Sequence, residues 1–79
     1  MELQITGPTE RRQVQVAWIE FNGTSGNFVI QRGHAPMVLT IAPNSSVIFR
    51  LTTGKQEVYR VAKGVVHVTR TGVTLIVVQ

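Results

Sequence analysis

The sequence has 79 residues, of which 43% are hydrophobic and 15% are charged. This length leaves room for one domain, residues 1–79, and the composition is too apolar and too weakly charged for a disordered chain. The lack of cysteine excludes disulfides, thiolate metal ligands and a cysteine nucleophile. The net charge of +4 is compatible with nucleic acid, an anionic membrane or an acidic protein as partner, or simply with solubility.

Apolar and polar residues alternate with a period of two along the chain, and β-branched residues are frequent, so we predict strands and no helix. Turn-forming residues such as Gly7-Pro8 and Asn22-Gly23 separate the strands. Short strands at this spacing predict an all-β fold, a small antiparallel β-sandwich or flattened barrel of about eight to ten strands. The predicted strands span residues 2–6, 14–21, 28–31, 37–41, 47–52, 57–62, 65–69 and 73–78.

The alternation changes phase within the second predicted strand. Val14, Val16 and Trp18 share one face, whereas Ile19 and Phe21 share the other. Such a change predicts a bulge, or a strand that passes from one sheet to the other. The last predicted strand is apolar on both faces, and we expect burial within the fold to be the reason, with contact to a partner as the alternative.

The sequence offers no catalytic constellation. It contains serine and histidine but no aspartate, and no serine stands in a nucleophile-elbow context. Neither His34 nor His67 has a second ligand at metal-binding spacing, and the glycines are isolated turn residues, unlike a phosphate-binding loop. We therefore predict a protein without catalytic residues, metal or cofactor.

Small basic β-domains can bind nucleic acid when several aromatic side chains form a stacking platform beside basic residues. The five aromatic residues of this chain are instead spread over the predicted strands, as core residues are. We expect no nucleic-acid partner. A free-standing basic module that binds nucleic acid or another polyanion is kept as the alternative function, and its contact residues would be Arg50, Arg60, Lys63 and Arg70.

The segment GNFVIQRGHAP, residues 26–36, contains a Gly-His-Ala-Pro motif. Together with the later segment VAKGVVHVTRTGVTLIV it resembles the N-terminal β-sandwich domain of the epsilon subunit of F-type ATP synthases, and the resemblance covers nearly the whole chain. Val29, Arg32 and Asn44 depart from the family pattern, which affects loop geometry more than the fold. The matching residues are Gly26, Phe28, Ile30, Gly33, His34, Ala35, Pro36, Pro43, Gly64, Val68, Val73, Thr74 and Leu75.

The resemblance implies a non-catalytic subunit of the rotor, in the central stalk, that helps to couple ion translocation to ATP synthesis. The implied partners are the gamma subunit and the ring of c subunits. The expected location is the cytoplasmic face of the bacterial inner membrane, as a peripheral part of the complex. No direct membrane insertion is expected, because the apolar runs are far shorter than a spanning helix requires. The helical hairpin that carries inhibition in the family is missing, so we expect no self-inhibition.

Two sets of contact residues follow from the resemblance. Asn27 stands where many bacterial members have an acidic residue, so it would bind through amide hydrogen bonds. His34 would border the gamma subunit, although the alternative is that its ring nitrogens satisfy backbone groups of the loop. The expected contacts with the c ring are Thr24, Ser25, Gly26, Asn27 and Phe28, and those with the gamma subunit are His34, Met37 and Leu39.

Overall fold

The computed structural model describes residues 1–78, and these contain eight strands. All eight predicted strands are present, although their ends differ by up to a few residues, so the all-β prediction is confirmed. Within residues 1–78 there is no helix, and hence none with the length and hydrophobicity that a membrane crossing requires. The strands are β1 (Glu2–Thr6), β2 (Arg11–Gly23), β3 (Gly26–Gln31), β4 (Met37–Thr40), β5 (Ser45–Leu51), β6 (Gln56–Val61), β7 (Lys63–Val68) and β8 (Gly72–Val78).

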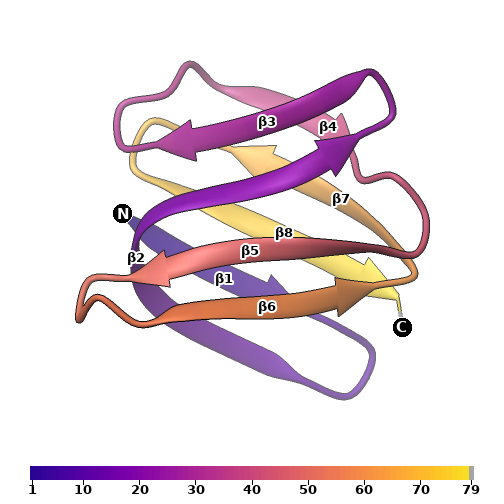
Figure 1. Cartoon of the computed structure of the whole chain (residues 1–79), viewed down its shortest axis with the longest axis horizontal. Helices are drawn as coiled ribbons and strands as arrows, with labels where there is room; N and C mark the ends of the chain where they lie inside the picture. The colour runs from indigo at the N-terminus through magenta and orange to yellow at the C-terminus, as the bar shows by residue number, and fades with distance from the viewer. Residues whose placement is uncertain (79) are drawn as a thin grey trace.

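The strands form two layers that are joined through β2 (Figure 1). The first layer has the order β4-β7-β8-β1, and β1 pairs with the first part of β2. The second layer consists of the last part of β2, with β3 on one side and β5 and then β6 on the other. The described pairings are antiparallel, except that β1 and β8 run parallel. The chain therefore passes through both layers before its last strand meets its first.

Strand β2 contains the predicted irregularity. Its register against β5 shifts between Val16 and Trp18, so Ala17 is the additional residue of a bulge. After the bulge Ile19 and Phe21 are buried, and Trp18 lies on the outer face of the second layer, half-buried. Both interpretations of the phase change are confirmed, because β2 has a bulge and also passes from one layer to the other.

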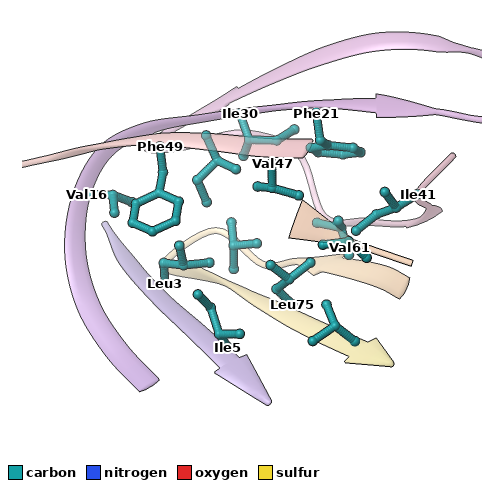
Figure 2. Close-up of a cluster of buried hydrophobic side chains, with 14 of the residues drawn as sticks. Leu3, Ile5, Val16, Phe21, Ile30, Ile41, Val47, Phe49, Val61 and Leu75 are labelled. Atoms are coloured by element: carbon teal, nitrogen blue, oxygen red, sulfur yellow. The ribbon is translucent and has the colours of Figure 1, made fainter. Parts of the chain in front are cut away.

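The core lies between the two layers and is entirely apolar (Figure 2). Its largest side chains are Phe21 and Phe49, both 1% exposed or less, and no polar or charged side chain is buried among the described residues. Burial of each such apolar side chain stabilises a fold by roughly 1.5–3 kcal/mol. Because the core holds no polar group, any binding function belongs to the surface of the sandwich.

Turns and loops gather at two ends of the sandwich (Figure 1). At the β2–β3 end, the backbone of residues 41–44 is bonded to both layers, because Ala42 donates to the carbonyl oxygen of Asn22 on β2 at 2.8 Å and Ile41 to that of Gly64 on β7 at 2.9 Å. Asn44 has a φ of +53°, a left-handed conformation that Asn tolerates almost as glycine does. The opposite end, the β7–β8 end, holds residues 31–36, 52–55 and 69–72.

Strand β8 has one buried and one exposed face. Val73, Leu75 and Val77 belong to the core, whereas Ile76 and Val78 are 51% and 56% exposed. The expectation that both apolar faces would be buried is wrong, because the second layer covers only the inner face of the β4-β7-β8-β1 layer.

The two layers are also linked by polar contacts outside the core. The Arg12 guanidinium donates to both carboxylate oxygens of Glu57 on β6, each at 2.8 Å, and lies 5.6 Å from the centre of the Phe49 ring. The Tyr59 hydroxyl donates to the Glu10 carboxylate. Burial of the hydroxyl, followed by the hydrogen bond to Glu10, raises the pKa of Tyr59 to about 12. These contacts hold β6 against the start of β2.

We expect Gly64→Ala to lower the free energy of unfolding by about 1–3 kcal/mol, the usual cost of overpacking. A Cβ at Gly64 would lie 3.0 Å from the carbonyl oxygen of Ile76 and 3.1 Å from side-chain atoms of both Ile41 and Val61. The control is Gly7→Ala, whose Cβ would have no contact closer than 3.5 Å. Urea unfolding of both variants measures the difference, and equal midpoints would contradict the crowding argument.

Titration of the phenolate absorbance should report a pKa near 12 for Tyr59, the single tyrosine of the chain. Glu10→Gln should lower this pKa while leaving it above 10, because burial is the largest cause of the shift. In the unfolded chain the pKa is about 10, so the free energy of unfolding should fall as the pH rises from about 10 to 12. Tyr59→Phe should remove this dependence of the free energy of unfolding on pH. A phenolate titration midpoint near pH 10 in the folded protein would contradict the raised pKa of Tyr59.

Candidate functional site

The expected c-ring contact lies in the turn between β2 and β3. Thr24 and Ser25 form this turn, since Gly23 and Gly26 are the last paired residues of the two strands. Residues 24–27 are exposed. The turn is tied to β4, because the Thr24 N–H donates to the carbonyl oxygen of Thr40 at 3.3 Å. The structure thus presents an exposed polar turn on a fixed base at one end of the sandwich.

Asn27 and Phe28 support this turn from within β3. The Asn27 Nδ2 donates to the Asn22 side chain at 3.0 Å and to the carbonyl oxygen of Phe21 at 3.4 Å. The ring of Phe28 is half-buried and stacks on that of Phe21, with centroids 5.6 Å apart, and a Cβ at Gly23 would come within 2.9 Å of it. Phe28 therefore positions the turn, and the contact of Asn27 with a partner stays a prediction.

His34 lies in the loop before β4. A bond of 3.1 Å from its N–H to the Gln31 carbonyl oxygen closes a turn in which Gly33 has a φ of +82°, a conformation that favours glycine. The His34 Nδ1 donates to the carbonyl oxygen of Ala35 at 2.8 Å. The expectation that a ring nitrogen satisfies the loop backbone is confirmed, and contact with a partner stays a prediction.

Met37 and Leu39 point to the inner side of β4. Both are half-buried and pack against the core, where their cross-strand partners Val68 and Val66 are buried. The residue between them, Val38, is 65% exposed. Their role as gamma contacts stays a prediction, and the exposed apolar side chain of β4 is Val38.

Val38 belongs to an exposed apolar surface that the sequence did not reveal. The register places Val65 on β7 between Thr40 on β4 and Ile76 on β8. Val65 is 36% exposed. Among the described residues, four of the six exposed large hydrophobic side chains lie on this side of the first layer, which makes it the main apolar surface. We call it the β4–β7–β8 face, and define it by Val38, Val65, Ile76 and Val78.

A groove connects this face with the β2–β3 turn. It has a volume of about 420 Å³, and its walls include Thr24 of the turn, Lys63 at the start of β7, and Val65, Ile76 and Val78 of the face. The exposed turn and the apolar face therefore form one continuous surface at the β2–β3 end.

The basic residues of the polyanion alternative do not gather on one surface. Arg50 and Arg60 lie on the outer face of the second layer, cross-strand from Trp18 and Ser46. Lys63 lines the apolar groove, and Arg70 lies in the β7–β8 turn at the opposite end. Within residues 1–78, no three histidine or acidic side chains lie together in a way that could hold a metal ion.

Two solved structures resemble this fold closely. A chain of the mitochondrial ATP synthase from Euglena gracilis (OSCP/F1/c-ring, rotational state 1) superposes with a TM-score of 0.88 at 26% identity, over 98% of this chain and 49% of that one. A chain of the Tetrahymena thermophila mitochondrial ATP synthase (central stalk/c-ring) gives a TM-score of 0.85 at 16% identity, over 100% of this chain and 63% of that one, and supports the fold alone.

This chain thus spans about half the length of the first of these chains and under two thirds of the second. A search of curated proteins by sequence finds no match. The sequence model of the family described as "ATP synthase, Delta/Epsilon chain, beta-sandwich domain" matches residues 1–79. Delta and epsilon chains are non-catalytic subunits of this rotary complex. Because the match extends over the whole sequence, the chain belongs to the family of β-sandwich domains of the ATP synthase delta/epsilon chain.

Proposed function

We propose that this domain is a rotor element of an F-type ATP synthase that binds the gamma subunit and the c ring and so couples ion translocation to ATP synthesis. Family membership supports a place in the central stalk. The observation that carries the proposal is the continuous surface formed by the β4–β7–β8 face and the β2–β3 turn. It offers an apolar contact and a polar contact side by side on one rigid body.

The β4–β7–β8 face is suited to the gamma subunit. Its defining residues are 36–65% exposed, and their cross-strand neighbours Thr40, His67 and Lys63 carry no negative charge. The predicted gamma contacts Met37 and Leu39 flank Val38 on β4, at the edge of this face. Burial of apolar side chains at its centre stabilises an interface, and such an interface persists at high salt.

The β2–β3 turn is suited to the polar loops of a c ring. Its backbone groups and the Asn27 Oδ1 can form hydrogen bonds, while Phe28 and Phe21 fix the base of the turn. The loss of the acidic residue costs little, because exposed ion pairs contribute only about 0–1 kcal/mol. The densely packed apolar core makes the sandwich stiff. The turn and the face therefore move together, as torque transfer requires.

The proposed location follows from these partners. The domain would lie at the membrane that carries the synthase, as a peripheral part of the complex. The cytoplasmic face of a bacterial inner membrane stays a prediction, and the two similar structures come from mitochondrial enzymes.

Co-expression with the gamma subunit of the same source should yield a one-to-one complex on size exclusion at about 0.5 M salt, where surface charges are screened. Val38→Lys should raise the Kd about tenfold or more, as expected for a charge placed in an apolar interface centre. The matched control is Val58→Lys, because Val58 is 63% exposed and Val38 is 65% exposed, but Val58 lies on the second layer.

If Val38→Lys and Val58→Lys raised the Kd for gamma equally, the β4–β7–β8 face would not be the gamma contact. Separate peaks for the wild-type domain and gamma, with the domain instead retained on a polyanion column at low salt, would favour the basic module, because polyanion binding weakens steeply with salt.

Binding of the purified gamma complex to isolated c ring should depend on the β2–β3 turn. We expect Ser25→Trp to weaken co-sedimentation with the ring about tenfold or more while leaving the gamma complex intact, because the bulky side chain separates two fitted surfaces. Thr53→Trp places the same side chain in an exposed turn at the opposite end and should have no effect. Unchanged ring binding by the Ser25 variant would rule out this turn as the contact.

A further inference from the structure

The β7–β8 end contains a polar groove whose lining residues are not among the predicted gamma or ring contacts, although the predicted gamma contact His34 lies in the same loop as Arg32. It has a volume of about 390 Å³, and its walls include Gln15, Arg32, Arg70 and Thr71. This size is within the range of sites that hold small molecules. The loops that contribute Arg32, Arg70 and Thr71 to this groove lie at the end of the sandwich opposite to the β2–β3 turn (Figure 1), so a ligand bound there would face away from the proposed ring contact.

Two arginines from distant parts of the sequence line this groove. Arg32 follows β3 of the second layer and Arg70 precedes β8 of the first, and both are exposed. Among residues 1–78 the one ion pair is that of Arg12 with Glu57, so neither guanidinium forms an ion pair with a carboxylate in that part of the chain. Guanidinium groups bind the oxygens of phosphate in a bidentate manner.

Both arginines stand on turns whose backbone is fixed by hydrogen bonds. Arg32 lies inside the turn that the His34 N–H closes on the Gln31 carbonyl oxygen at 3.1 Å. Arg70 lies inside the turn that the Thr69 N–H closes on the Gly72 carbonyl oxygen at 2.8 Å, and the Thr69 hydroxyl strengthens it. Fixed backbones reduce the entropy that is lost when a ligand is bound.

The remaining groups of the groove favour an anion, with one exception. The Thr71 hydroxyl and the Gln15 amide can donate hydrogen bonds. Glu2 also lines the groove, and its carboxylate accepts a hydrogen bond from the Gln13 amide. Its negative charge opposes an anionic ligand, but the side chains of Arg32 and Arg70 together outweigh it by one unit of charge.

We propose that this groove is a binding site for the phosphate group of a small soluble molecule, held by Arg32 and Arg70 with hydrogen bonds from Thr71 and Gln15. The phosphate chemistry of the groove does not depend on the proposed gamma or ring contacts, but the choice of a soluble ligand rests on the proposed function. A lipid headgroup presents the same chemistry, but the groove is at the end opposite to the turn proposed to face the membrane ring, which favours a soluble ligand.

The test is a titration of the isotope-labelled chain with inorganic phosphate at low salt, followed by amide NMR. Saturable shifts should centre on Gln15 and Thr71. Arg32→Gln and Arg70→Gln should each raise the Kd about tenfold, as expected when one charge-assisted contact is lost, whereas Glu2→Gln should lower it. Lys63→Gln removes the same charge at the other end and should change the Kd less than about twofold. Unchanged dispersion of the amide signals verifies that each variant is folded.

Three outcomes would overturn the proposal. Equal weakening by Arg32→Gln and Lys63→Gln would mean attraction by net charge alone, and an equal response to acetate would mean a site without preference for phosphate. Binding to vesicles that contain phosphatidic acid, combined with no response to free phosphate, would assign the groove to a lipid instead of a soluble ligand.

Discussion

Strand β2 determines the architecture, because it is the one strand that belongs to both layers in the described chain. Its first part pairs with β1, and its last part pairs with β3 and β5. Between the two parts, the extra residue Ala17 shifts the side-chain alternation by one position. Without this bulge strict alternation would turn Ile19 and Phe21 to the outside and remove both from the core that lies between the layers. The packing of both layers therefore depends on a local irregularity of a single strand.

A sandwich of two layers covers only one face of each layer, and this limits where function can reside. The buried side chains of residues 1–78 are all apolar, so the interior offers no polar side chain to a ligand. The outer face of β4, β7 and β8 keeps exposed valine and isoleucine side chains, whereas the two ends carry turns with polar and charged side chains. The apolar face and the polar turn are therefore continuous at the β2–β3 end, whereas the polar groove lies at the β7–β8 end.

The features that depend on residues close together in the sequence, namely the strands and the bulge, were predictable. Alternation and turn residues located all eight strands, and the phase change at Trp18 and Ile19 predicted the bulge. Pairing was not predictable, because it depends on long-range packing; this applies to the parallel pairing of β1 with β8 and to the meeting of Arg32 with Arg70. The run Met37-Val38-Leu39 is apolar at every position, so alternation could not show that Val38 alone points outward. The two apolar faces of β8 posed the same problem, and only the position of the second layer decided it.

The parallel pair of terminal strands has a consequence for the way in which the chain folds. The neighbours of Leu3 include Val73, so the central pairing of the first layer closes a loop that contains nearly the whole chain. Contacts of such large sequence separation carry the highest loop-closure entropy and slow folding. During synthesis on the ribosome, β1 can pair with β2 early, but its other edge stays open until β8 has emerged. The nascent domain therefore exposes an unpaired edge of β1 from the emergence of β2 until that of β8, and such an edge is a site at which other chains can associate.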